Sequence, residues 1–292
     1  SDKTLMRNQI ANNLFLSFNE KKSPSQYIHV IINDVYEGLY LLTEHPEQQF
    51  QTLISDTTNF NFLLQIDRGP FDFYSEKDNL GYKCEYPKNV TEDIINKINL
   101  FTQNISKDTI NFSKIDILSF IDLIILNEVT KNIDAYRLST YLSHIENKFS
   151  VDIIWDFDLS FGLANYNDGF NHEGFIIESD INTFIPRLWL QLWTNEVIQE
   201  KLKIRYQELR LDILSTQNIH NNIDSVYNQI YPAAQQNFKR WSILGEDVWP
   251  NKFQFNSYQE EIDYLKDWSM KRLDWLDRRW NLNTTTKKLM KN

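Results

Sequence analysis

A long helical pattern of hydrophobic positions falls in residues 113–132. Apolar side chains recur there every three or four positions, at Ile115, Leu118, Ile121, Ile125 and Val129. This spacing places them on one face of an α-helix, with Ser113 as N-cap and Asn132 at an end that tolerates the left-handed conformation. The pattern predicts a buried helix that ends just before Asp134, which we place in the following loop.

Two strand-like runs follow this helix. Residues 136–143 and 148–155 are rich in aromatic and β-branched side chains and are separated by a short polar segment, so they predict a β-hairpin. Asp156 and Asp158 come where the second strand ends, and they point to opposite faces if the strand continues through them. The hairpin therefore folds Asp156 back toward Asp134.

The N-terminal part predicts a small, mostly antiparallel sheet packed with helices. A helical stripe covers residues 4–18, and strand-like runs cover residues 27–32, 39–44, 61–67 and 81–86. Asn33 and Asp34, followed by Gly38, predict a hairpin between the first two runs. Another amphipathic helix begins at Thr91, and we expect it to cover the sheet.

The C-terminal part predicts a helical mass. Residues 165–180 are polar and aromatic and contain two glycines, which favours a mobile loop over a site. One helix begins at Pro186, another covers residues 223–231 with a kink expected at Pro232, and a capping box at Ser257 starts the last. The predicted fold class is therefore α+β.

The domain organisation that we expect is a single unit, residues 1–292. Residues 1–112 form its sheet-rich part, and residues 113–292 contain the hairpin and the larger helical part. No run approaches the ~20 apolar residues of a membrane-spanning helix, so we expect a soluble segment.

Composition removes several classes of function. A net charge of −10 argues against nucleic acid as a partner, because phosphate-backbone binding needs a clustered excess of Lys and Arg. With seven glycines the chain has neither a Walker loop nor a GxGxxG loop, so arginine and lysine side chains must hold the phosphates of any bound nucleotide. Cys84 is the only cysteine, which leaves no disulfide framework.

Other catalytic classes lack their motifs. The five histidines show no HExxH spacing and no GxSxG occurs, so zinc and serine-hydrolase chemistry are unsupported. Most of the eight tryptophans fall on helical stripes that predict core packing. A carbohydrate-binding or carbohydrate-active protein remains an alternative, and it would show an open aromatic cleft away from Asp134.

Several segments resemble the bacterial spore-coat CotH kinase family, whose members are similar to atypical protein kinases. The most specific are LNEVTKNIDAYRLSTYL at residues 126–142 and IIWDFDLSFG at residues 153–162. Further segments in the same order are DKTLMRNQIA, NDVYEGLYLLTE and LLQIDRG, at residues 2–11, 33–44 and 63–69. The resemblance implies an atypical protein-kinase-like fold and family strands upstream of Ser1.

The resemblance also assigns catalytic roles. Protein kinases place a catalytic-loop Asp after a helix and a metal-holding Asp after a hairpin, which here are Asp134 and Asp156. A kinase-like core has Asn as a second metal ligand five residues after the catalytic Asp, and Ser139 stands at that position. Asp156 and Ser139 are thus the candidate Mg²⁺ ligands. The alternative is that Asp156 and Asp158 only terminate a strand.

Basic side chains are the candidates for nucleotide binding. Lys83 is the candidate phosphate-binding lysine, with Glu44 as the carboxylate that positions it. Arg7 and Arg137 are alternative phosphate contacts.

These residues lead to one main functional hypothesis. The chain is expected to be a CotH-like kinase that uses ATP and Mg²⁺ to phosphorylate Ser or Thr of a protein at the cell surface, on the spore coat or among secreted proteins. The alternative is a catalytically inactive relative that serves as a structural or interaction module of a surface assembly.

Overall fold

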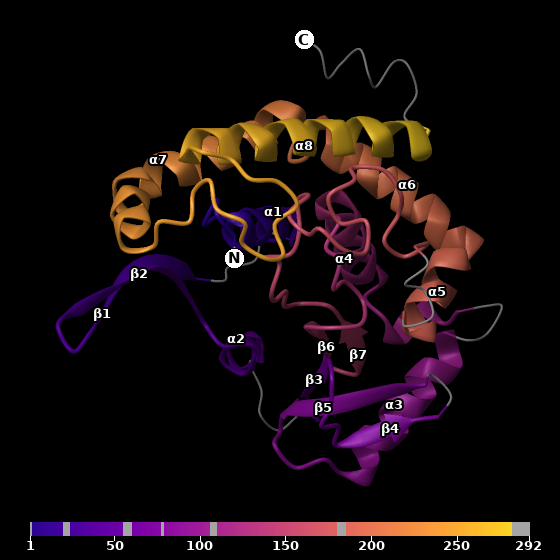
Figure 1. Cartoon of the computed structure of the whole chain (residues 1–292). Coiled ribbons are helices and arrows are strands. Elements are labelled where there is room, and N and C mark those ends of the chain that lie inside the picture. The colour runs from indigo at the N-terminus through magenta and orange to yellow at the C-terminus, as the bar shows by residue number, and fades with distance from the viewer. Residues whose placement is uncertain are drawn as a thin grey trace.

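A computed structural model describes residues 2–19, 24–54, 60–76, 79–105, 110–179 and 185–281. Its strands, in chain order, are β1 (Ser25–Ile32), β2 (Val35–Thr43), β3 (Phe62–Ile66), β4 (Phe73–Ser75), β5 (Leu80–Tyr86), β6 (Thr140–Ile145) and β7 (Lys148–Ser150). Its helices are α1 (Arg7–Asn19), α2 (Pro46–Leu53), α3 (Glu92–Ile105), α4 (Ile117–Thr130), α5 (Arg187–Thr194), α6 (Glu196–Leu211), α7 (Thr216–Arg240) and α8 (Tyr258–Arg279), with a 3₁₀ turn η1 (Phe112–Lys114). The α+β prediction is confirmed (Figure 1).

The strands form two antiparallel sheets. The larger has five strands in the order β4-β5-β3-β6-β7, so the hairpin β6–β7 pairs with β3 from the N-terminal part. In this pairing Leu64 lies opposite Leu142, and both side chains are buried in the main core. The sheet therefore draws strands from both sides of residue 112.

The hairpin β1–β2 stands apart and projects from the body of the molecule (Figure 1). The end of α7 holds it. The side-chain oxygen of Asn237 accepts the Leu39 backbone N–H at 2.9 Å, and the indole N–H of Trp241 donates to the Glu37 carbonyl at 2.8 Å. Gly38 lies between these contacts with φ 126°, and a Cβ there would come within 2.7 Å of Asn237. Only glycine allows this approach.

Helix α4 runs through the centre of the molecule and is buried from Ser119 to Thr130. The predicted Ser113 N-cap is wrong. Ser113 lies in η1, and the side chain of Asp116 accepts the Ser119 N–H instead. The reason is a long-range pairing, because Ile115 forms a β-bridge with Phe149 and cannot join the helix. At the other end Lys131 takes the left-handed conformation with φ 46°.

The hairpin β6–β7 is shorter than its pattern predicts. Tyr136 and Ser139 have positive φ, so β6 begins only at Thr140, and β7 ends at Ser150. Residues 151–157 lie outside any strand, and Asp156 itself has φ 63°. Strand alternation therefore does not decide where Asp156 and Asp158 point.

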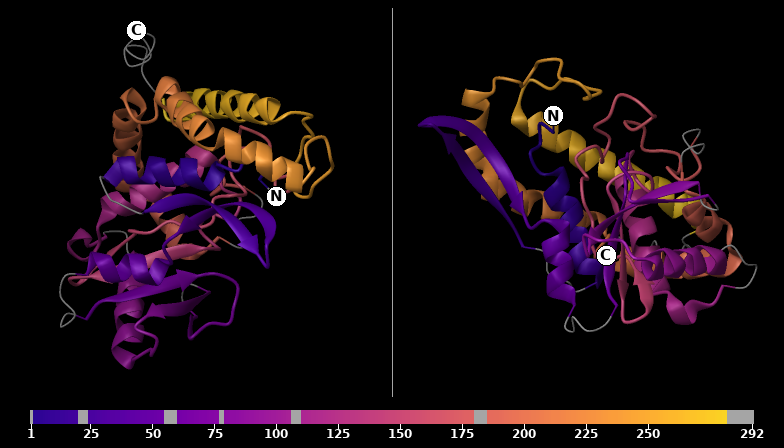
Figure 2. Two further views of the ribbon diagram at one scale, coloured as in Figure 1. Left: turned by 90° about the vertical axis from the view of Figure 1, so that its left-hand side faces the viewer. Right: turned by 90° about the horizontal axis from the view of Figure 1, so that it is seen from below.

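The helical C-terminal part is confirmed, with changes in detail. The helix predicted from Pro186 is two helices, α5 and α6, which are divided at Asn195. Helix α7 is 25 residues long in all and continues through Pro232. The capping box between Ser257 and Glu260 is present at the start of α8. In Figure 1 and in the left view of Figure 2, α7 and α8 lie next to each other on the far side of α1 and α4 from the main sheet. Among the described helices, none combines the length and the apolar character needed to cross a membrane.

The segment predicted as a mobile loop is tied to the core over residues 165–179. The Lys131 ammonium donates to the carbonyls of Asp168, Asn171 and Glu173. The guanidinium of Arg272, which is fully buried, donates to the carbonyls of His172 and Gly174 and forms an ion pair with Glu128. The Glu128 carboxylate in turn accepts the backbone N–H groups of Ile176 and Ile177. These contacts fix the loop beside α4 and α8.

Candidate active site

Asp134 lies in the tight turn that follows α4. Its backbone N–H donates to the Asn132 side chain at 3.2 Å, and its carbonyl accepts the Leu138 N–H at 3.1 Å. Arg137 donates from one guanidinium nitrogen to the Asp134 carboxylate at 3.0 Å and to the Ile133 carbonyl at 2.9 Å. Burial raises the pKa of Asp134, and Arg137 opposes the rise. In this structure Arg137 therefore positions Asp134.

Ser139 connects the turn that holds Asp134 to two further carboxylates. Its hydroxyl oxygen lies 3.4 Å from Asp156 Oδ2 and 3.5 Å from Asp67 Oδ2, and its backbone N–H donates to Asp67 Oδ2 at 3.2 Å. The structure thus brings the two predicted metal ligands, Ser139 and Asp156, into contact. It also adds Asp67, which the sequence reasoning missed.

Asp67 follows directly after β3, whereas its sequence predicts only the last residue of a strand. Its side chain also accepts from Gln65 Nε2 at 3.0 Å and from the Arg68 N–H at 2.7 Å. The signal that identifies it is long-range, since Ile66 pairs with Thr140 and so places the residue after β3 beside the residue before β6.

The four aspartates of this region influence one another. Burial, followed by the neighbouring Asp156 carboxylate, raises the pKa of Asp158 to about 6. Asp158 and Asp67 also contribute to the raised pKa of Asp134. Asp134, Asp67, Asp156 and Asp158 therefore lie in one electrostatic neighbourhood. Within the described ranges, no three Asp, Glu, His or Cys side chains are close enough to form a complete metal site on their own.

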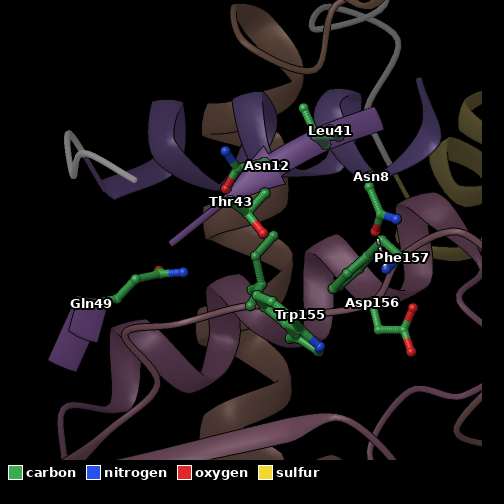
Figure 3. Close-up of a pocket in the computed structure, with 9 residues that line it drawn as sticks. Asn8, Asn12, Leu41, Thr43, Gln49, Trp155, Asp156 and Phe157 are labelled. Atoms are coloured by element: carbon green, nitrogen blue, oxygen red, sulfur yellow. Dashed lines mark hydrogen bonds between the residues drawn. The ribbon is translucent and has the colours of Figure 1, made fainter. Parts of the chain in front are cut away.

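A cavity of about 280 Å³ opens next to Asp156 (Figure 3). It lies between α1, the end of β2, α2 and the segment that carries Asp156. Its described lining residues are Asn8, Asn12, Leu41, Thr43, Gln49, Ile154, Trp155, Asp156 and Phe157. Asn8 accepts the Phe157 backbone N–H and so fixes the segment that borders the cavity. Asp134 is not among these lining residues, so the cavity approaches the aspartates from the Asp156 side.

Lys83 and Glu44 do not form the predicted pair. Lys83 is exposed on β5 and forms an ion pair with Glu85, whose carboxylate also binds Lys88 at 3.2 Å. Glu44 follows β2 and is half-buried. Lys83 nevertheless lies opposite Gln65, which binds Asp67, so it occupies the same face of the sheet as the aspartates.

Arg7 is buried, with 1% of its surface exposed. Its guanidinium pairs with Asp2 and donates to Thr4 Oγ1 and, at 3.0 Å, to the Ser160 carbonyl. This placement does not support Arg7 as a phosphate contact, because its donors face the protein interior. Arg7 instead holds the loop that follows Asp158.

Comparison with known families bears on the whole arrangement. The family model described as CotH kinase protein matches residues 1–276, from before α1 into the last turns of α8. The chain belongs to the CotH kinase protein family. A search of curated proteins gave no match. The CotH match extends beyond residue 162, where the resemblance seen in the sequence became weak.

This CotH family member also carries an aromatic pair beside Asp134. The rings of Tyr166 and Trp249 are stacked with centroids 5.8 Å apart and planes 5° from parallel. Burial, and then the Asp134 carboxylate, raise the pKa of Tyr166, which places the pair next to the turn that holds Asp134. Trp249 is 69% exposed, so it is an exception to the expectation that tryptophans fill the core.

Proposed function

We propose that the protein is an ATP- and Mg²⁺-dependent kinase that phosphorylates Ser or Thr of a surface, spore-coat or secreted protein. The observation that carries the proposal is the contact of Ser139 with both Asp67 and Asp156. It joins the turn that holds Asp134 to the carboxylate that borders the cavity. Membership of the CotH kinase protein family supports the same chemistry.

The donor set at Ser139 fits Mg²⁺. Asp156 and Asp67 offer carboxylate oxygens and Ser139 offers a hydroxyl, all of them hard ligands. Mg²⁺ in phosphoryl-transfer sites uses one or two carboxylates together with water and substrate phosphates, so a sparse protein site is what it requires. When bound, the ion would neutralise negative charge on the transferring phosphate.

The cavity suits the nucleoside part of ATP. Amide side chains of Asn8, Asn12 and Gln49 border it, and Trp155 and Phe157 give it aromatic surface. None of its described lining residues is cationic. The phosphates must therefore extend toward the metal ligands.

Lys83 is the proposed cation for those phosphates, since it shares the sheet face of Gln65 and Asp67. Its side chain is half exposed, and the buried Glu85 carboxylate keeps Lys88 as a second partner at 3.2 Å, so Lys83 can leave Glu85 for a phosphate oxygen.

Asp134 acts on the acceptor. Its carboxylate would accept the proton of the substrate hydroxyl as the hydroxyl oxygen bonds to the γ-phosphorus of ATP. The bond between that phosphorus and the oxygen that bridges it to the β-phosphate breaks in the same step, which releases ADP. Arg137 keeps the carboxylate oriented through its 3.0 Å hydrogen bond. Burial raises the basicity of Asp134 and so favours this role.

The test is phosphate transfer from γ-labelled ATP with Mg²⁺, to the chain itself and to a general Ser-rich acceptor such as casein. Wild type is expected to transfer label and Asp134→Asn to lose at least 10²-fold in rate. Asp212→Asn, at an exposed loop position outside the site, is the matched control and should transfer normally. Absence of transfer by wild type, together with unchanged melting temperature in Mg-ATP, would favour the inactive structural module.

A further inference from the structure

A second cavity lies at the other end of the β6–β7 hairpin. Its volume is about 390 Å³, within the usual range for sites of small organic ligands. The described residues that line it are Lys97, Leu100, Phe101, Asn104, Asn111, Lys114, His144, Asn147 and Phe149. His144 comes five residues after Ser139, which along a strand is about 16 Å. The cavity is therefore separate from the proposed kinase site.

One side of this cavity is apolar. Phe101 of α3 and Phe149 of β7 stack with ring centroids 4.1 Å apart and planes 17° from parallel. His144 packs edge-on against Phe149 at 4.9 Å. Leu100 forms an apolar wall and is 64% exposed. The faces of Phe101 and Phe149 are turned to each other, so the cavity meets the edges of these rings, and an apolar group would cover those edges together with Leu100.

The rim is positive although the chain as a whole carries a net charge of −10. Lys97 and Lys114 both line the cavity, and none of its described lining residues is acidic. Lys97 donates to the neutral side-chain oxygen of Asn147 at 3.1 Å. Within the described part of the chain, neither lysine forms an ion pair with a carboxylate. The two charges are thus available to an anion.

His144 reports the same positive potential. Its Nδ1 lies 3.1 Å from the Phe60 carbonyl, so this nitrogen carries the proton, because a carbonyl can only accept. Burial, Lys97 and Lys114 together lower the pKa of His144 to about 4, and the ring is neutral at physiological pH. Its other nitrogen is then an acceptor. On the opposite rim, the side-chain amide of Asn104 donates to the Asn111 carbonyl and accepts the Asn111 backbone N–H.

We propose that this cavity binds a small anion with a planar apolar body, such as an aromatic carboxylate. The body packs against Leu100 and the edges of Phe101 and Phe149, and the carboxylate lies between Lys97 and Lys114. A neutral molecule of the same shape gains the apolar contact but not the charge pairing. This proposal does not depend on the proposed kinase activity.

Ligand-observed NMR with the whole chain tests it, with 2-naphthoate as the probe and 2-naphthamide as its neutral counterpart. At low salt the carboxylate is expected to bind roughly tenfold more tightly than the amide, the effect of two partly exposed charge pairs. The double variant Lys97→Gln/Lys114→Gln should bind both probes equally. The double variant Lys201→Gln/Lys239→Gln removes the same charge from exposed positions on α6 and α7, and it should retain the preference.

Leu100→Glu provides an independent variant that leaves the fold intact, since the side chain is mostly exposed. It should abolish naphthoate binding, whereas Ile204→Glu on α6, at an exposed position with 48% exposure, should not. Equal binding of the two probes to wild type, or no saturable binding at millimolar concentration, would overturn the proposal. An equal loss in the control double variant would reduce the effect to the overall charge of the chain and overturn it as well.

Discussion

Replacement of Glu261 with glutamine should change how stability depends on pH. Glu261 lies in the first turn of α8 with 3% of its surface exposed, and its Oε1 has no hydrogen-bond partner among the described residues. Burial raises its pKa to about 7, while Arg7 and Lys3 oppose the rise. The native protein therefore holds a proton at Glu261 at pH values where the unfolded chain has already released it.

The sign and size follow from linkage. An unfolded glutamic acid titrates near pH ~4.3, so the folded state binds more protons between about 4.3 and 7 and loses stability as pH rises through that window. From pH ~5.5 to ~8.5 the loss is about 2 kcal/mol, because one pKa unit corresponds to ~1.4 kcal/mol. Glutamine cannot ionise. The difference in unfolding free energy between Glu261→Gln and wild type should therefore grow by about 2 kcal/mol over this range, in favour of the variant.

Melting temperature measured at both pH values is the assay. A change of about 2 kcal/mol corresponds to a relative shift of roughly 4–8 °C for a chain of this size. Glu208→Gln is the matched control, since the Glu208 side chain is 61% exposed and should show no comparable shift. A constant difference between Glu261→Gln and wild type across the range would show that the carboxylate is ionised throughout, and the reasoning from burial would be wrong.

Three further predictions concern the loop and the site. Lys131→Met removes an ammonium group that donates to three backbone carbonyls of the loop, so it should lower the melting temperature by roughly 5–10 °C. The control Lys271→Met, at an exposed i,i+4 ion pair, should change the melting temperature by about 1 °C. An equal change in both variants would refute the anchoring role of Lys131. Ser139→Asn should lower the Mg²⁺ concentration needed for half-maximal phosphate transfer, because the asparagine amide oxygen reaches further toward the metal and asparagine tolerates the positive φ at this position. An unchanged Mg²⁺ dependence would show that residue 139 is not a metal ligand. Lys83→Met removes the proposed phosphate-binding ammonium group and should raise the KM for ATP roughly tenfold in a steady-state transfer assay. The control Lys239→Met should leave this KM unchanged. A normal KM in Lys83→Met would exclude Lys83 as a phosphate contact.

The parts of the fold that sequence predicted well are those with a local cause. Helix α4 was predicted because apolar residues alone determine its burial, and the capping box of α8 because Ser257 and Glu260 lie three residues apart. The N-cap of α4 was not predicted correctly, because Ser113 and Asp116 are both suitable N-cap residues on local grounds. The bridge between Ile115 and Phe149, distant in sequence, decides between them.

The site divides in the same way. Asp134, Ser139 and Asp156 lie within one motif-bearing stretch, and the structure brings Ser139 into contact with Asp156. Asp67 precedes Ser139 by 72 positions, and only the register of β3 on β6 brings them together. The pairing of Lys83 with Glu85 was available from strand alternation, because residues two apart share a face, but the kinase analogy favoured Glu44.

The most direct test of the proposed kinase is calorimetric titration of ATP into wild type, Asp156→Asn and Asp134→Asn, each with and without Mg²⁺. Wild type should bind ATP only with Mg²⁺. Asp156→Asn should lose this binding, because Asp156 is the exposed carboxylate that lines the cavity. Asp134→Asn should bind Mg-ATP as wild type does and yet fail to transfer phosphate. Mg-ATP binding by Asp156→Asn that equals wild type would contradict the account.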